Sequence, residues 1–293
     1  MASTDDRPAV LDRLRMPGPV LKALACPVCG AALGPSGNAL ACAAGHRFDV
    51  AREGYAGLLT GHGTAGTGDT KDMVRARKEF QDAGHYAPLA AHVAEAAAPH
   101  LAAGGLAADA GAGTGYYLAA VLEQAHRACG LSLDVSKFAL RRAARAHPRA
   151  GAAACDTWRG LPLRTGAADV LLNVFAPRRA AEFRRVLADD GALIVVTPTA
   201  HHLRDLVAAL GLVTVDADKP ERLQESLGGH FTRERTRELE VGLSLTPGEA
   251  AALVAMGPSA RHVEPERIAE RVAALGTPVT ARASFAVTVY SPA

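Results

Sequence analysis

Short apolar runs alternate with helical stretches between residues 106 and 197, and this alternation constrains the fold more than any other feature of the chain. The apolar runs that we expect to form strands are 106–110, 130–133, 152–155, 168–174 and 192–197. Helices are expected after four of these runs, which is typical of a parallel sheet covered by helices on both faces. Two later stretches, 231–243 and 279–290, alternate apolar with polar residues and are expected to close the sheet as an antiparallel pair. The sequence therefore predicts a seven-stranded, Rossmann-like α/β fold.

Two helices are expected before the first strand of this sheet. Thr70 can cap the first helix, which Gly84 ends, and the second is expected over 87–103. Upstream of them, the segment 61–69 holds four glycines in nine residues and is expected to be a flexible linker. We therefore divide the chain into a small N-terminal domain, residues 1–65, and a larger domain, residues 66–293.

The N-terminal domain contains a cysteine and histidine cluster with the spacing of a zinc site. The four residues Cys26, Cys29, Cys42 and His46 follow the pattern C-x2-C-x12-C-x3-H. Four such ligands complete a tetrahedron and leave no open position, so the zinc is expected to be structural. A module of about 35 residues is too short to fold by apolar burial alone, and 34–38 is expected to be a turn between two short strands. The alternatives are a chance arrangement of thiols and a redox pair at Cys26 and Cys29.

A glycine-rich turn follows the first expected strand. Its sequence is Asp109-Ala110-Gly111-Ala112-Gly113-Thr114-Gly115. Three glycines at alternate positions let the backbone approach a ligand closely and present amide N–H groups to it. The third glycine comes too early for the dinucleotide pattern, and the D-x-G-x-G-x-G form favours S-adenosylmethionine. Nineteen residues after Gly115, Asp134 ends the second strand, where a carboxylate can accept both ribose hydroxyls. The alternative is that Asp134 caps the helix beginning near Ser136.

Two further segments lie at the carboxyl edge of the expected sheet. Asp156 follows the third strand and can accept the exocyclic amine of adenine, while Trp158 can stack on that ring or belong to the core. After the fourth strand, the amide oxygen of Asn173 can hold an N–H group of the methyl acceptor and Phe175 can stack on a base. The alternative for this segment is a strand-ending turn with a packed Phe.

Composition and charge exclude several classes of protein. Hydrophobic residues make up 49% of the chain and charged residues 21%, which is ordinary for a globular protein. No apolar run of about 18 residues is present to span a membrane, and the N-terminus lacks the order of a secretory signal, so we expect a cytoplasmic protein. The net charge of +2 does not by itself predict a polyanionic partner.

Several ordered blocks of the sequence resemble one family over the full length of the chain. This family is the bacterial guanine-N1 methyltransferases of 23S rRNA, which include the tylosin- and mycinamicin-type resistance methyltransferases. The zinc pattern matches, and the other similar blocks are 46–55, 82–89, 113–117, 133–137, 173–177 and 255–259. The resemblance implies a class I methyltransferase domain that uses S-adenosylmethionine and follows a small zinc-ribbon domain.

The resemblance also implies roles for individual residues. Contacts to the methyl donor are implied for Tyr86, Gly113, Thr114 and His202, with His201 as the competitor for the last position. Members of the family form homodimers whose zinc modules help to build a cleft of the size of RNA. We therefore expect a homodimer in which the zinc ribbon positions 23S rRNA, and macrolide self-resistance is a possible role.

One departure from the family concerns the target base. Where the family has a Trp after the Met-Gly-Pro-Ser block, residues 259–262 read Ser-Ala-Arg-His, so Arg261 would have to stack on the base instead. Guanine N1 is protonated at neutral pH, and the sequence names no base for that proton. Two alternatives therefore stay open: a small-molecule methyltransferase on the same scaffold, and an inactive zinc-containing RNA-binding or regulatory protein.

Overall fold

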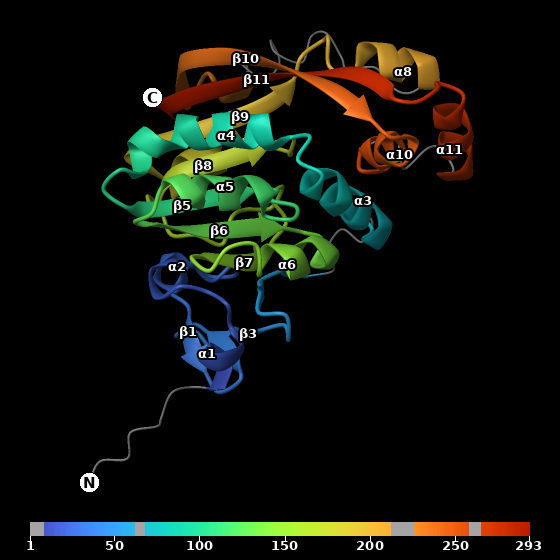
Figure 1. The fold of residues 1–293 in the computed structure, drawn as a ribbon. Coiled ribbons are helices and arrows are strands. Elements are labelled where there is room, and N and C mark those ends of the chain that lie inside the picture. Colours follow the sequence, from blue (N-terminus) through green and yellow to red (C-terminus); the bar gives the residue numbers. More distant parts are fainter. Residues whose placement is uncertain (1–8, 62–67, 212–225, 258–264) are drawn as a thin grey trace.

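The computed structural model describes residues 9–61, 68–211, 226–257 and 265–293. Arg261 lies outside these residues. The N-terminal part is small and lies at one end of the molecule (Figure 1). It contains α1 (Ala9–Arg13), α2 (Gly18–Ala23) and a three-stranded antiparallel sheet in the order β1-β2-β3. The strands are β1 (Gly34–Ser36), β2 (Ala39–Ala41) and β3 (Arg47–Asp49). The turn expected over 34–38 is shorter than predicted, because 34–36 form β1 and pair with β2. Gly37 supplies the positive φ of 58° that the tight connection requires.

The larger part is built on a sheet in the order β10-β11-β9-β8-β5-β6-β7-β4. Its strands are β4 (Ala56–Gly57), β5 (Gly105–Ala110), β6 (Ala128–Asp134), β7 (Ala150–Ala154), β8 (Ala168–Val174), β9 (Leu187–Pro198), β10 (Phe231–Leu245) and β11 (Val279–Pro292). Five consecutive strands from β9 to β7 pair in parallel, and β10 and β11 are antiparallel as predicted. The seven expected strands are therefore confirmed. An eighth strand, β4, comes from the N-terminal part and pairs in parallel with β7.

Helices cover both faces of this sheet, since two separate core clusters flank it, and Figure 1 shows the helices over the near face. They are α3 (Lys71–Asp82), α4 (Ala87–Ala97), the 3-10 helix η1 (Ala98–Leu101), α5 (Tyr116–Gln124), α6 (Lys137–Ala143), α7 (Ala180–Val186), α8 (Arg204–Leu210), α10 (Pro247–Ala255) and α11 (Pro265–Ala273). Thr70 caps α3 by accepting a hydrogen bond from the N–H of Met73, as expected. The prediction of one helix over 87–103 is wrong at its end, because Pro99 has no N–H to continue α4 and the chain tightens into η1.

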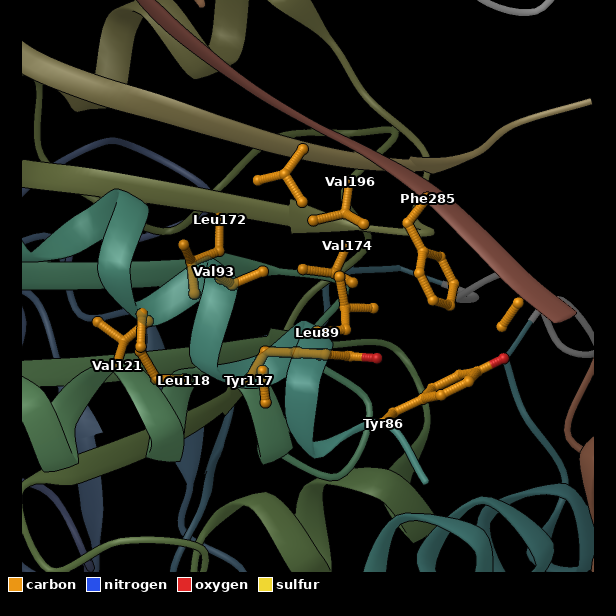
Figure 2. Close-up of a cluster of buried hydrophobic side chains, with 14 of the residues drawn as sticks. Tyr86, Leu89, Val93, Tyr117, Leu118, Val121, Leu172, Val174, Val196 and Phe285 are labelled. Atoms are coloured by element: carbon orange, nitrogen blue, oxygen red, sulfur yellow. The ribbon is translucent and has the colours of Figure 1, made fainter. Parts of the chain in front are cut away.

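The main core lies between the sheet and the helices α4 and α5 (Figure 2). Leu89 and Val93 of α4 meet Leu118 and Val121 of α5 above Leu172 of β8, and all five side chains are buried. Burying each such side chain stabilises the fold by about 1.5 to 3 kcal/mol relative to leaving it exposed. The strands of a parallel sheet are covered on both sides, which explains why their sequences are apolar runs rather than alternating patterns. In the part of the chain that the structure describes, no helix is long and apolar enough to cross a membrane.

Candidate functional site

The four predicted zinc ligands lie together. Their ligand atoms are all within 4.8 Å of one another. The Nδ1 atom of His46 is 3.3 Å from Sγ of Cys42 and 3.6 Å from Sγ of Cys26, and Sγ of Cys29 is 3.7 Å from Sγ of Cys42. A tetrahedron with Zn–S bonds of about 2.3 Å and Zn–N bonds of about 2.0 Å has edges of roughly 3.5 to 3.8 Å. The cluster therefore fits a zinc ion of the closed, structural type.

Two backbone knuckles hold these ligands. In the first, the N–H of Gly30 donates to the carbonyl of Cys26 at 2.8 Å, and in the second the N–H of Gly45 donates to that of Cys42 at 3.0 Å. Both glycines have a positive φ, 74° and 84°, which a residue with a Cβ rarely adopts. Burial acts to raise the pKa of the Cys42 thiol, but hydrogen bonds from the backbone and ring of His46 outweigh it and lower this pKa to about 6. The thiolate form that a metal requires is thus favoured.

A cavity of about 220 Å³ opens at the carboxyl ends of β5, β6 and β8. This is the position where ligands bind in open α/β sheets. Of the predicted site residues, the cavity is lined by Tyr86, Asp109, Gly111, Gly113, Asp134, Asp156 and Phe175. The structure thus brings together residues from five separate segments of the sequence. The lining does not include Thr114, Gly115, Asn173 or His202.

The glycine turn differs in one respect from its prediction. The N–H groups of Gly111 and Ala112 donate to the carbonyl of Leu133 at 2.8 and 3.0 Å, and the N–H of Gly113 donates to Oδ2 of Asp134 at 2.8 Å. The prediction that these amides point at a ligand is wrong, because the turn uses them to bind itself to the end of β6. Glycine is required here because the turn packs closely against the segment after β8: a Cβ on Gly111 would lie 2.4 Å from Cβ of Ala176. Such a turn offers little to a phosphate.

Asp109 is a buried acid with an unsatisfied carboxyl group. The residue is 1% exposed, and neither carboxyl oxygen has a hydrogen-bond partner among the described residues. Burial, with a smaller contribution from the nearby Asp134, raises the pKa of Asp109 from 3.8 to about 8. A buried carboxyl group without a hydrogen-bond partner lowers the stability of the fold unless a ligand in the cavity supplies that partner. Each carboxyl oxygen can accept from a hydrogen-bond donor of a ligand, and the ionised form can also pair with a cation.

Asp134 lies at the end of β6, as predicted. Its Oδ1 atom accepts a hydrogen bond from the N–H of Ser136 at 2.7 Å, and its Oδ2 atom accepts the N–H of Gly113. Burial raises the pKa of Asp134, although both N–H groups act in the opposite direction. Ser136 caps α6 by accepting from the N–H of Ala139, so Asp134 is not the helix cap. Each carboxylate oxygen keeps one lone-pair direction for a ligand hydroxyl.

Asp156 and Trp158 form one wall of the cavity. Oδ1 of Asp156 accepts the N–H of Trp158 at 3.0 Å, in a turn that follows β7. Trp158 is 58% exposed, which excludes a place in the core. Its ring is therefore available to a flat ligand.

Asn173 and Phe175 have different surroundings from those expected. Asn173 is fully buried, its Nδ2 atom donates to the carbonyls of Ala110 and Pro177 at 3.2 and 2.9 Å, and its Oδ1 atom accepts Nε of Arg178 at 3.1 Å. The predicted contact to a methyl acceptor is therefore wrong, because both ends of the amide hold the turn after β8. Phe175 does face the cavity, 44% exposed and with a φ of 54°.

The backbone at Phe175 is informative in itself. A left-handed conformation costs a bulky residue roughly 1 to 2 kcal/mol and persists only where the surroundings enforce it. The N–H of Phe175 donates to the carbonyl of Val196, and its ring lies 5.6 Å from that of Phe285. The turn that Asn173 holds thus presents an aromatic ring to the cavity.

The other residues that were predicted to contact the methyl donor lie behind the residues that line the cavity. Oγ1 of Thr114 donates to Oε1 of Gln81 at 2.6 Å, and Gly115, with a φ of 78°, packs against the end of α6. The ring of His202 lies 4.9 Å from that of Phe285, which in turn meets the ring of Tyr86 edge-on at 5.2 Å. Tyr86 and Tyr117 are buried members of the core that also reach the cavity (Figure 2). His201, the competitor of His202, is exposed and contacts Arg204.

Sequence reasoning missed several cavity residues. Arg77 forms an ion pair with Asp69 and donates from Nη2 to the carbonyl of Met256 at 2.9 Å. Gly68 and Asp69, expected to belong to a flexible linker, line the cavity and pack against the start of α6. The one available signal was Arg77 itself, a cation on the otherwise apolar side of α3.

The strand order, the glycine turn after β5 and the acidic cavity define a class I methyltransferase fold that follows a zinc ribbon. Residues 24–62 match the zinc-ribbon family model described as "RlmA, N-terminal". A Micromonospora griseorubida protein named as a 23S rRNA (guanine-N(1)-)-methyltransferase is 52% identical, covering 93% of this chain and 98% of its own length. The 23S rRNA (guanine(748)-N(1))-methyltransferase of Streptomyces fradiae is 49% identical, covering 87% and 92%. The chain belongs to the family of 23S rRNA guanine-N1 methyltransferases.

Similarity to solved structures is lower. The crystal structure of the MccD protein aligns with a TM-score of 0.48 and 14% identity, and the alignment covers 69% of this chain and 96% of that one.

Proposed function

We propose that this protein transfers a methyl group from S-adenosylmethionine to N1 of a guanine in 23S rRNA. The family membership carries this proposal, because two relatives of nearly the full length share about half of the residues of this chain. The relative from Streptomyces fradiae is named for guanine 748, and we propose the corresponding nucleotide as the target.

The residues of the cavity fit the methyl donor. S-adenosylmethionine, when bound, supplies an electrophilic methyl group on a sulfonium centre. It carries positive charge and two ribose hydroxyls but no phosphate. Asp109 would accept a positively charged or N–H group, Asp134 would accept the ribose hydroxyls with its free lone pairs, and Asp156 would accept the adenine amine beside Trp158. The occupied amides of the glycine turn favour this ligand over a dinucleotide, which needs N–H groups for its pyrophosphate.

The chain contributes mainly positioning to the transfer. Methyl transfer to a nitrogen lone pair needs the acceptor held in line at near-attack distance. Phe175 offers a ring on which the target guanine can stack at the cavity mouth, and Asn173 acts as a positioning residue because it fixes the turn that carries Phe175. The target base would enter from a loop, where it is already unpaired. The N1 proton must be removed in or before the transfer, and its acceptor is left unassigned.

Several wider expectations remain proposals. The domain boundary near residue 65 and the cytoplasmic location rest on sequence patterns alone. The resemblance and the family are the support for the homodimer, for the zinc ribbon as an RNA-positioning element and for macrolide self-resistance. Of the individual roles, donor contacts by Thr114 and His202 would have to act through Gln81 and Phe285, since both side chains lie behind the cavity wall.

The test is transfer of a labelled methyl group from S-adenosylmethionine to unmethylated 23S rRNA, followed by nuclease digestion and mass spectrometry. The expected product is 1-methylguanosine at a single nucleotide. Labelled 23S rRNA with another modified base would overturn the proposed acceptor. If no label enters RNA while calorimetry detects donor binding, the small-molecule alternative replaces the proposal, and absence of donor binding supports the inactive alternative.

A further inference from the structure

A second cavity, of about 480 Å³, lies between α3, α6 and the segment that follows β3. We call it the α3–α6 groove, and its basic residues are Arg52, Lys71, Arg75, Arg141, Arg142 and Arg145. Among the described residues that line it, Glu53 is the one acid. We propose that the α3–α6 groove binds the phosphate backbone of the substrate RNA next to the methylated base. This inference rests on the proposed function and adds a binding site to it.

Residues from three segments form the groove, and contacts between these segments hold it in shape. Glu53, whose side chain is 12% exposed, contacts Nε of Arg52 at 3.2 Å and Nε of Arg141 at 3.1 Å. It therefore ties the end of the N-terminal part to α6. Val74 is buried and Phe138 is half-buried, so the floor is apolar while the rim is basic. The guanidinium of Arg141 lies over the ring of Phe138, 5.7 Å from its centre.

The positive charge of the groove is not balanced by the protein. Glu53 compensates part of two arginines, and Arg75 pairs with the exposed Asp72. Lys71, Arg142 and Arg145 are exposed, and among the described residues no acidic group is recorded within ion-pair distance of them. Exposed Arg forks without a partner suit phosphate oxygens, which they bind in a bidentate manner.

Helix stability does not account for this arrangement. Arg141 and Arg142 occupy the last turn of α6, where positive charge is favourable. Lys71, however, is the first residue of α3, where a positive charge opposes the helix dipole. The position of Lys71 costs the free protein stability, and an anionic partner would recover that cost.

The groove adjoins the donor cavity. Asp69, Asp134 and Val135 line the cavity, and Lys71 and Phe138, two and three residues further along their segments, line the groove. Oγ of Ser136 donates to the carbonyl of Asp69 at 2.7 Å and fixes the two segments to each other. Figure 1 shows α3 and α6 beside the carboxyl ends of the parallel strands. A strand whose base enters the cavity can therefore place neighbouring phosphates in the groove.

The experiment measures the affinity of the full-length protein for unmethylated 23S rRNA as a function of salt. Each lost phosphate contact reduces the slope of log K against log salt by about 0.7 to 0.9. For the double variant Arg142→Gln, Arg145→Gln we expect a slope smaller by about 1.4 to 1.8, and a Kd roughly 25- to 60-fold higher at about 0.1 M salt if the two proteins converge near 1 M. Affinity for S-adenosylmethionine should stay the same.

The matched control is Arg233→Gln, Arg237→Gln. It removes the same charge from exposed positions on β10, at the opposite edge of the sheet from α6, and should leave the slope unchanged. The variant Lys71→Gln tests the other helix and should lower the slope by about 0.7 to 0.9. It also keeps the inference falsifiable if the double variant does not fold.

The outcomes separate the inference from the proposed function. Equal slopes for wild type, double variant and Lys71→Gln, with 1-methylguanosine still formed, would overturn the groove alone. Loss of slope in the control as large as in the double variant would also overturn it, because the effect would then be one of net charge. Failure of the wild type to methylate 23S rRNA would instead refute the proposed function, while the slopes would still report on the groove.

Discussion

Replacement of Asp109 by Asn should stabilise the protein without ligand and weaken its binding of S-adenosylmethionine. Asp109 is buried with neither carboxyl oxygen paired, and burial raises its pKa from 3.8 to about 8. In the folded protein it therefore keeps a proton that the unfolded chain loses. Asn has nearly the same shape and does not titrate, so the variant removes this linkage and leaves the packing in place.

The sign and size follow from that pKa. Because the folded pKa lies above the unfolded one, the free energy of unfolding of the wild type falls as pH rises from about 4 to about 8, by about 1.4 kcal/mol per pH unit. Between about pH 5.5 and about pH 7.5 the wild type should lose roughly 2 to 3 kcal/mol relative to Asp109→Asn. When a cation binds, the carboxylate gains a partner that Asn cannot replace, so donor affinity should fall by at least about 30-fold, or about 2 kcal/mol.

The assay is urea unfolding of both proteins at the two pH values, together with calorimetric titration of S-adenosylmethionine. The matched control is Asp190→Asn, the same chemical change at an exposed position of β9, which should alter neither quantity. A difference in unfolding free energy that does not change with pH would show that Asp109 is not an unpaired buried acid. Unchanged donor affinity would remove Asp109 from the donor site.

Three further predictions concern the other parts of the site. Replacing Cys26 by Ser should abolish the binding of about one zinc ion per chain, measured by metal analysis, and should reduce RNA affinity before donor affinity. Replacing Asn173 by Ala should cost about 1 to 3 kcal/mol in urea unfolding, because buried carbonyls and Arg178 lose their partner; no loss would show that the amide does not hold the turn. Replacing Phe175 by Gly relieves the left-handed backbone and should not lower stability, whereas kcat/KM for rRNA should fall with donor affinity intact; full activity would exclude base stacking there.

Most of the fold could be predicted from the sequence because the sheet is parallel and covered on both faces. The central residues of each strand from β5 to β9 are buried on both sides, so a mainly apolar run marks the strand, and β8 begins and ends where its run does. The start of β9 was missed, because the exposed Asp189 and Asp190 follow its first residues and interrupt the apolar pattern. The strand β4 could not be predicted, because a strand of two residues is too short to show an alternation of apolar and polar residues. Its pairing with β7 also depends on how the N-terminal part packs. The end of α4 was missed although the sequence marks it, because Pro99 lacks the N–H that would continue the helix.

The sequence predicted the site best where the residue types and their spacing by themselves determine the role. The zinc ligands were found by spacing, since a tetrahedral ion fixes the residue types and the distances. The roles of Asn173 and of the glycine amides were misjudged, because a sequence shows that a donor is present but not which acceptor uses it. Arg77 and Met256 reach the cavity from distant segments, and only the packing of α3 against α10 brings them there.

Charge shows most clearly what the sequence hides. A net charge of +2 predicts no polyanionic partner, yet the charges are sorted into two neighbouring sites of opposite sign. Among the residues that the structure describes, the donor cavity is lined by four acids, Asp69, Asp109, Asp134 and Asp156, and one cation, Arg77, whereas the α3–α6 groove is lined by six cations and one acid. A cationic donor and an anionic RNA must meet in one reaction, and each would be repelled by the field that attracts the other. Placing the two sets of charges in neighbouring sites resolves that conflict. Net charge cannot show it, because it adds the charges of the whole chain without regard to their position.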